Sequence, residues 1–133
     1  MGQQQLLLIV LGVIIVGIAV VVGINIFSAS SSNANRDAVI SDLTNLAAMA
    51  QQYFRKPVAM GGGGNSFVGF TTDKIPTKLL ANQNGKYSIS TAGTATSIAF
   101  TAVGKEVGYD GSDSIRVTMV VAPDEITSTT NTN

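Results

Sequence analysis

The sequence contains no cysteine, no histidine and no tryptophan. Without cysteine the chain has no disulfide, no thiolate nucleophile and no cysteine-based zinc or iron–sulfur site. Without histidine it also lacks the most frequent general base and the commonest metal ligand. The remaining polar residues do not form a recognisable catalytic motif. The sequence therefore predicts a protein that is not an enzyme and that holds no cofactor and no metal.

Charged side chains are scarce as well. They make up 12% of the 133 residues, against about 25% in an ordinary soluble domain. Eight basic and eight acidic residues give a formal net charge of zero. Because nucleic-acid binding depends on a basic surface that neutralises phosphates, the composition predicts no nucleic-acid contact.

A long uncharged and apolar run is present instead, from Leu6 to Ile24. As a helix this run is about 28 Å long, which matches the bilayer hydrocarbon core of about 30 Å. Its apolar side chains surround the helix on all sides, which indicates burial by lipid or by other helices. The first ionisable side chain is Arg36. A cleaved signal peptide, with Ser28 to Ser30 as the processing site, and an ordinary single-pass anchor are alternative interpretations of this run.

Three glycines interrupt the apolar run, at positions 12, 17 and 23. Glycine lowers helix stability but permits close helix approach or local unwinding. The spacings of five and six residues do not form a GxxxG face. Gly12 and Gly17 are candidate positions for unwinding of the helix.

No proline or glycine lies between Ile24 and Lys56, so nothing forces the helix to end at a membrane surface. The polar residues from Ser28 to Asn35 favour helix only weakly, and a break with Ser32 or Asn35 as a new N-cap is the alternative. We expect one continuous helix that ends before Pro57.

The second half of this helix is amphipathic. Apolar residues recur at spacings of three and four, which places them on one helical stripe. This stripe is predicted to pack against a β-sheet, through Ile40, Leu43, Ala47, Ala50 and Phe54, with Val39, Leu46 and Tyr53 widening it.

Residues 57–86 are expected to form a Gly-rich connecting loop region, in which Val58 to Gly64, with four consecutive glycines, make a flexible connection between helix and sheet. A phosphate-binding loop is disfavoured, since no Gly-Lys-Ser/Thr follows at the required spacing. The segment Ser66 to Phe70 reads either as a short strand or as an ordered loop.

Alternating apolar and polar residues in the range 87–126 predict an antiparallel sheet of three or four strands. Tyr87 and Ile89 alternate with serines just after the turn dipeptide Asn84-Gly85. Two further alternating runs follow, with apolar residues at positions 98, 100 and 102 and at positions 115, 117, 119 and 121. The predicted fold class is α+β, a long N-terminal helix with a small antiparallel sheet.

Acidic residues near the C-terminus favour turns over metal sites. Asp110, Asp113 and Asp124 could offer oxygens to calcium, but the twelve-residue EF-hand pattern is absent, so a solvated hairpin turn is the preferred interpretation. Residues 127–133 are all Ser, Thr or Asn and are expected to form an exposed tail, disordered or O-glycosylated.

The order of these segments resembles type IV pilins and the related pseudopilins. The hydrophobic first segment, residues 1–27, opens with a short uncharged start, Met1 to Gln5, before its apolar helix begins at Leu6. An amphipathic continuation over 28–56 and a C-terminal β domain follow. The resemblance implies a structural subunit that is stored in the cytoplasmic membrane and then polymerises with identical subunits into an extracellular filament on the cell surface. It further implies a prepilin peptidase, an assembly ATPase and a membrane platform protein as partners, with Met1 as the processed and N-methylated residue.

One position departs from the family pattern. In the family the fifth mature residue is usually Glu, which pairs with the N-terminal amine of a neighbouring subunit. If Met1 is the first mature residue, Gln5 holds that place here. We predict that Gln3, Gln4 and Gln5 form a polar amide cluster in place of that ion pair. The predicted filament core consists of Leu6, Leu7, Leu8, Ile9, Val10, Leu11, Val13, Ile14, Ile15, Val16, Ile18, Val20, Val21, Val22, Ile24 and Phe27.

Two alternative functions remain open at this point. The first is a pseudopilin of a type II secretion system, which we disfavour because the β domain is small, weakly charged and without a convincing calcium loop. The second is a single-pass membrane protein whose β domain has a binding role. The sequence does not distinguish adhesion, motility or DNA uptake as the use of a filament.

Overall fold

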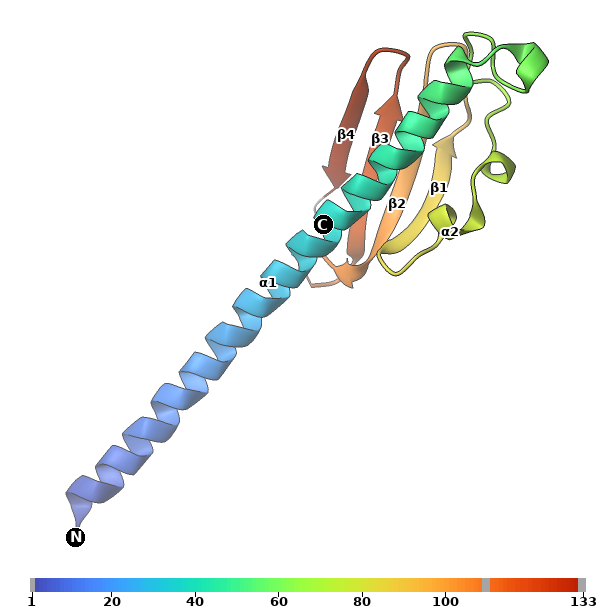
Figure 1. Cartoon of the computed structure of the whole chain (residues 1–133). Coiled ribbons are helices and arrows are strands. Elements are labelled where there is room, and N and C mark those ends of the chain that lie inside the picture. Colours follow the sequence, from blue (N-terminus) through green and yellow to red (C-terminus); the bar gives the residue numbers. More distant parts are fainter. Residues whose placement is uncertain (1, 109–110, 132–133) are drawn as a thin grey trace. The chain divides into compact units, whose positions relative to one another are not determined.

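The computed structural model describes residues 2–108 and 111–131. The chain divides into two units, Met1–Ser31 and Ser32–Asn133. The helical elements are α1 (Gln3–Arg55), the 3-10 turns η1 (Val58–Met60) and η2 (Thr72–Lys74), and α2 (Thr77–Leu80); the strands are β1 (Gly85–Thr91), β2 (Ile98–Val107), β3 (Ser114–Val121) and β4 (Ile126–Asn131) (Figure 1).

Helix α1 is a single element of 53 residues, which confirms the prediction of one continuous helix. The polar residues between Ser28 and Asn35 do not break it, and it passes through Gly12 and Gly17 without unwinding. It ends at Arg55, two residues before Pro57. Proline disfavours helical geometry in the residue before it, which accounts for the position of this end.

The glycine-rich loop after α1 is tied to the end of the helix by backbone hydrogen bonds, and its flexibility stays a prediction. The Gly63 N–H donates to the carbonyl of Tyr53 at 2.8 Å, and the Asn65 N–H donates to that of Phe54 at 2.7 Å. These bonds satisfy carbonyls in the last turn of α1, which have no partner inside the helix. A Cβ on Gly63 would overlap the Ser66 carbonyl oxygen, so the chain can pass here only because the residue is glycine.

The four strands form one antiparallel sheet in the order β1-β2-β3-β4. Ile89 pairs with Phe100 and Phe100 with Met119, so the apolar positions of neighbouring strands lie in register on one face. This confirms the predicted alternation in β1, β2 and β3. The sheet begins two residues earlier than expected, at Gly85.

The predicted C-terminal tail is a strand. Residues Ile126–Asn131 form β4, which pairs with β3 from Val121↔Ile126 to Arg116↔Asn131. The expectation of exposure is confirmed for residues 127–130, whereas the expectation of disorder was wrong for residues 127–131. Thr and Ile favour extended backbone, and the neighbouring strand supplies the hydrogen bonds. Residues 132 and 133 lie outside the described part.

The core lies between the C-terminal half of α1 and one face of the sheet. Leu43, Ala47 and Ala50 are fully buried, as the stripe predicts, while Ile40 and Phe54 are only partly buried at its margins. Val39 and Leu46 are more central than expected. Nine described side chains of the sheet belong to this core cluster: Tyr87, Ile89, Ile98, Phe100, Ala102, Ile115, Val117, Met119 and Val121.

The loop Ser66 to Phe70 also belongs to this core, as an ordered loop and not as a strand. Phe67 and Phe70 are buried, with the Phe67 ring centroid 4.7 Å from that of Phe54. Phe70 meets Phe100 edge-on at 6.1 Å. Edge-on and offset contacts of this kind add to the stability that burial alone provides.

Replacing Leu43 by Ala tests the contribution of the helix stripe. We expect the free energy of unfolding of the β domain to fall by about 2–5 kcal/mol, because a fully buried side chain is replaced by a cavity. Denaturant titration of the full chain in detergent micelles, followed by the circular dichroism of the sheet, measures this change. Asn45→Ala, at an exposed position of the same helix, serves as control and should change it by less than about 0.5 kcal/mol. Equal effects of the two changes would contradict the assignment of the stripe.

Candidate assembly surface

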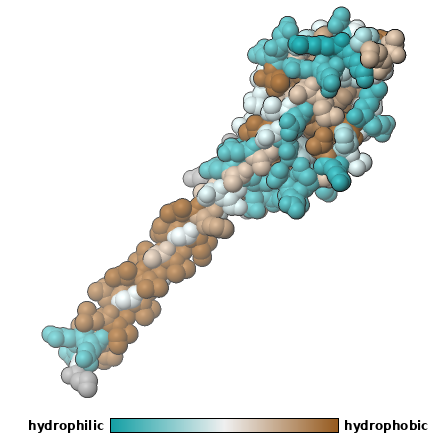
Figure 2. All heavy atoms as spheres, viewed as in Figure 1, coloured by the Kyte–Doolittle hydropathy of each residue, from teal (hydrophilic) through white to brown (hydrophobic). Residues whose placement is uncertain are grey.

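Residues 2–31 of the first unit expose a long apolar surface. Every large apolar side chain from Leu6 to Phe27 is between 49% and 74% exposed. In Figure 2 this part of the helix is almost continuously brown, the colour of hydrophobic residues. The predicted filament-core residues therefore all lie on the surface of the single chain.

This exposure is too costly for a helix surrounded by water. Burying one Val, Leu or Ile contributes about 1.5–3 kcal/mol, so exposing the predicted core residues would cost several tens of kcal/mol. A folded domain as a whole is stable by only about 5–15 kcal/mol. By length and composition, α1 is the one helix among the described residues that could cross a membrane. The apolar surface requires lipid or other protein as its surroundings.

The glycines of this segment have no structural role within the chain. A Cβ built on Gly12, Gly17 or Gly23 would meet no atom within 4 Å. Each glycine lowers helix stability by roughly 0.5–1 kcal/mol relative to alanine, and the described residues supply no contact that compensates for it. Unwinding at Gly12 and Gly17 does not occur in the single chain, and a role in contacts between chains stays a prediction.

The polar start of the helix is also exposed. Gln3, Gln4 and Gln5 form the first turn of α1, and no hydrogen bond connects their side chains to other described residues. Their amide groups can donate and accept hydrogen bonds. The predicted amide cluster would be formed between chains and is not tested by a single chain. Met1, the predicted site of processing and methylation, lies outside the described residues.

The second unit begins with polar contacts from α1 to the end of the sheet. The Ser32 hydroxyl donates to the carbonyl of Val107 at 2.8 Å. The Asn35 side chain donates to the Asn84 carbonyl at 2.8 Å and accepts a hydrogen bond from the Glu106 N–H at 3.4 Å. A Cβ on Gly104 would overlap the Asn35 side-chain oxygen, so this strand position is glycine because the helix passes close to it.

One carboxylate on α1 forms the main polar contact with the sheet. Asp42 Oδ2 accepts hydrogen bonds from Asn82 Nδ2 at 2.8 Å, from Asn84 Nδ2 at 3.0 Å and from the Tyr87 hydroxyl at 2.6 Å. The Asn82 side-chain oxygen in turn accepts the backbone N–H groups of Asn84 and Gly85. The carboxylate therefore fixes the turn before β1 against the helix.

The hydrogen bonds also set the ionisation of this cluster. Burial by itself raises the pKa of Asp42, but hydrogen bonds from Asn84, Tyr87 and Asn82 outweigh it, so the pKa lies below the ordinary value of 3.8. Burial, followed by the hydrogen bond to Asp42 and its negative charge, raises the pKa of Tyr87. Both shifts keep the pair as a carboxylate and a neutral phenol at physiological pH.

The sequence analysis did not find this cluster. Asn84-Gly85 was identified as a turn, but the turn residues lie more than forty positions from Asp42. In the sequence, a carboxylate beside an apolar helical stripe looks the same whether it bonds to another part of the chain or faces solvent. Only the folded arrangement of α1 and β1 brings these groups together.

The acidic residues considered for calcium do not form a metal site in the described part of the chain. Asp113 and Asp124 are exposed, and no group of three potential ligands occurs among the described residues. Asp110 lies outside them. The connection between β2 and β3 contains Gly111 with φ +75°, a conformation typical of a turn.

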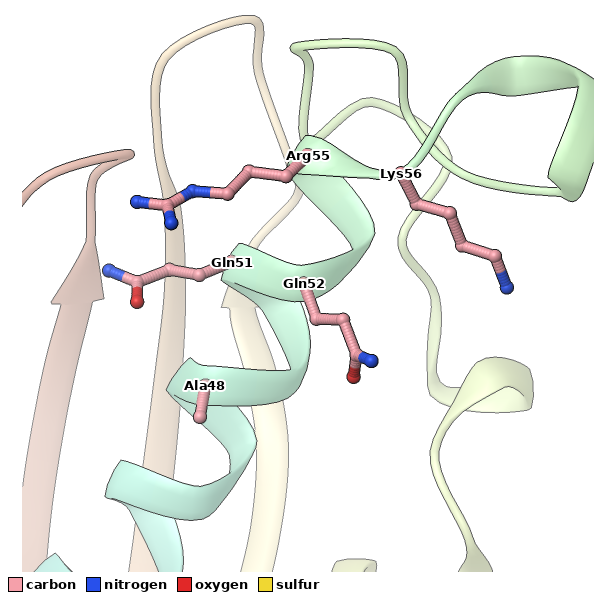
Figure 3. Close-up of a pocket in the computed structure, with 5 residues that line it drawn as sticks. All are labelled: Ala48, Gln51, Gln52, Arg55 and Lys56. Atoms are coloured by element: carbon pink, nitrogen blue, oxygen red, sulfur yellow. The ribbon is translucent and has the colours of Figure 1, made fainter.

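A hollow on the last turns of α1 is lined by Ala48, Gln51, Gln52, Arg55 and Lys56. Four of these side chains come from α1 and Lys56 directly follows its last residue. Figure 3 shows Gln51 and Arg55 extending to one side and Gln52 and Lys56 to the other. Gln51 and Arg55 donate to the carbonyls of Ala122 and Pro123, at 3.1 Å and 3.5 Å. The hollow contains no nucleophile and no acid, and two of its polar groups already serve as contacts between helix and turn.

Comparison of the chain with protein-family models, with characterised proteins and with solved structures gives no match. The exposed apolar segment and the polar helix-to-sheet contacts therefore have to be interpreted from their own residues.

Replacing Asp42 by Asn tests the polar cluster and its dependence on pH. A hydrogen bond to a charged group contributes about 1.5–3 kcal/mol when fully buried, and Asp42 is only partly buried, so we expect a loss of about 1 kcal/mol at pH 7. Because the folded-state pKa is lowered, this contribution is fully present above pH 3.8 and is lost as the pH falls through the folded-state pKa. The difference between the two proteins should therefore vanish in strong acid.

Unfolding midpoints measured from pH 7 down to pH 2 would show this convergence. Asp37→Asn removes an exposed carboxylate from the same helix and serves as the matched control, with little effect at any pH. A constant difference between wild type and Asp42→Asn across the whole range would contradict the role of the ionised carboxylate.

Proposed function

We propose that this chain is the structural subunit of an extracellular filament of the type IV pilus kind and that it polymerises through the apolar segment Leu6 to Phe27. The single observation that carries the proposal is this segment, exposed on all sides of a helix that continues into a folded β domain. A soluble protein with only catalytic or ligand-binding duties has no need for a helix that is apolar all round.

The apolar segment suits two environments. In the cytoplasmic membrane, lipid covers the side chains before assembly. In a filament, copies of the same helix replace lipid contacts with Leu, Ile and Val contacts, so the free energy of transfer is close to zero and packing decides the balance. Gly12, Gly17 and Gly23 leave room for close approach of neighbouring helices, which gives a reason for glycines that no contact inside the chain requires.

The β domain supports the same proposal through its strong attachment to the helix. Three hydrogen bonds to Asp42, the contacts of Ser32 and Asn35, and the buried stripe tie the sheet to α1. A head-to-tail contact between identical helices that does not close into a ring produces a helical polymer. Every such polymer would display the β domain at the surface.

The partners follow from the proposal and from the resemblance to type IV pilins. They are identical subunits, the membrane before assembly, and an assembly machinery with an ATPase, a platform protein and a prepilin peptidase. A membrane-anchored β domain with a binding role uses the same apolar segment, but it leaves the three glycines without a purpose. Within the same family, the alternative function is that of a pseudopilin of a type II secretion system.

Mass spectrometry of fibres sheared from cells tests the proposal. We expect this polypeptide to be the major component, with Met1 at its start and N-methylated. Recovery of the chain only in the membrane fraction, from cells without fibres, would instead establish the single-pass anchor.

Replacing Gln5 by Leu tests the polar start of the helix. We expect the yield of sheared fibres to fall, because the change removes a donor and an acceptor from the amide cluster while keeping the helix. Gln5→Glu should retain assembly, since a carboxylate can pair with the N-terminal amine of a neighbour. Gln83→Leu, at an exposed position of the β domain, is the control for a general effect of losing a surface amide. Unchanged fibre yield in Gln5→Leu would count against the amide cluster.

A further inference from the structure

Strand β4 lies at the edge of the sheet, next to β3 alone (Figure 1). Its residues Ile126, Ser128 and Thr130 pair with Val121, Met119 and Val117, which are buried under α1. All three nevertheless remain exposed. The helix therefore does not cover this strand, and β4 has neither a buried face nor a neighbour on its outer side among the described residues.

The outer edge of β4 lacks the usual protection against strand pairing. Natural edge strands carry charges, prolines or bulges, or are covered by a loop. Residues 126–131 contain no charge and no proline, and their pairing with β3 shows no register shift. The opposite edge differs, because β1 carries Lys86 and a register shift between Ile89 and Thr91, and Ala81 bridges to Lys86.

The hydrogen-bonding groups that face outward can be assigned from the turn before β4. The Ala122 N–H donates to the Glu125 carbonyl at 2.8 Å, which closes the turn between β3 and β4. In an antiparallel pair, hydrogen-bonded and non-hydrogen-bonded positions alternate from such a closing pair. This alternation leaves the backbone groups of Ile126, Ser128 and Thr130 directed toward the free edge.

We propose that β4 pairs in antiparallel fashion with β4 of a second copy of this chain, about a twofold axis at Ser128. In this arrangement Ser128 lies opposite Ser128 of the partner copy, and Ile126 lies opposite Thr130. In a twofold pairing the two neighbouring strands are copies of the same segment. A charged residue near the axis would therefore lie next to the same charged residue of the partner copy, which is destabilising. Strands β1, β2 and β3 each contain a charged residue, and β4 is the one strand of the four that has none.

The alternative of one sheet continued from subunit to subunit is disfavoured. It would require β4 to pair with β1 of the next copy, and β1 is obstructed by its bulge and by the Ala81 bridge. The β4–β4 contact has a different consequence, because a twofold axis turns the two chains in opposite directions. Within the proposed filament all subunits point the same way. If that function holds, the contact joins two filaments that run in opposite directions; the pairing itself does not depend on it.

Cysteine cross-linking of the detergent-solubilised full chain tests the pairing, and the absence of natural cysteine makes the reporter unique. The two Cα atoms of a hydrogen-bonded antiparallel pair lie about 5.5 Å apart, within the disulfide range of about 4.4–6.8 Å. Ser128→Cys should therefore give a disulfide-linked dimer under mild oxidation. Thr127→Cys is the matched control, because the two copies of residue 127 would lie roughly 8 Å apart, and it should give little dimer.

A second measurement uses sedimentation of the same solubilised chain. Ser128→Pro removes an N–H at the free edge but no hydrogen bond to β3, so the fold should persist while the dimer is lost. Ser128→Lys places two positive charges at the axis and should have the same effect, whereas Ser128→Thr should keep the dimer. Circular dichroism verifies that the sheet remains folded in each variant.

The result of these tests is independent of filament formation, since solubilised chains are not assembled. Equal cross-linking of Ser128→Cys and Thr127→Cys would overturn the proposed register. A Ser128→Cys protein that forms no disulfide with its own copy, or that links to another polypeptide instead, would overturn the pairing, even if cells make fibres of this chain.

Discussion

The apolar side chains between Leu6 and Phe27 have no partner within their own chain, and this constraint governs the rest of the molecule. They are about half to three-quarters exposed, and exposing them to water would cost several times the stability of an ordinary domain. The segment must therefore always be covered by lipid or by other proteins. A helix of this length and composition is consistent with membrane anchoring, and the proposed filament would supply the alternative cover.

The same helix meets a different requirement in its second half. From Val39 onward its apolar residues are confined to one stripe, and the sheet covers that stripe. Between the two apolar regions, Ser32 and Asn35 make side-chain hydrogen bonds to the end of the sheet, and Asp42 anchors the turn before β1. The side chains that make these bonds are short and polar. They occupy the part of the helix between the segment that is apolar on all sides and the stripe that is apolar on one side, and the helix continues through it without a break. Within the second unit they tie the sheet to the helix residues from Ser32 onward.

Local patterns in the sequence were sufficient for most of this architecture. The length of α1 followed from the absence of proline and glycine between Ile24 and Lys56, and the inward positions of β1, β2 and β3 followed from alternation. Strand β4 was missed because neither of its faces is buried, so no apolar alternation marks it. The hydrogen bonds of the glycine-rich loop were not predicted because they end on carbonyls of the last turn of α1, which a local pattern does not reveal.

Long-range polar contacts were not predictable for a related reason. The partners of Asp42 lie at positions 82, 84 and 87, and a carboxylate and two amides at such separations have no spacing rule. The loop phenylalanines at 67 and 70 were likewise not assigned to the core, although they complete it. The apolar segment is the opposite case, because its composition alone shows that its side chains need cover by lipid or by other protein.

The distribution of charge connects the two incompletely covered surfaces. All sixteen charged residues lie from Arg36 onward, and none lies in β4. The apolar segment and the edge of β4 are thus both uncharged, so copies of either surface can meet without repulsion between like charges. Charged groups near an interface mainly exclude wrong contacts and set orientation. Among the described residues these charged groups lie in the second half of α1, in the loops and short helices, and in strands β1 to β3. The two proposed contacts between identical chains therefore use the surfaces where no charged side chain would oppose them.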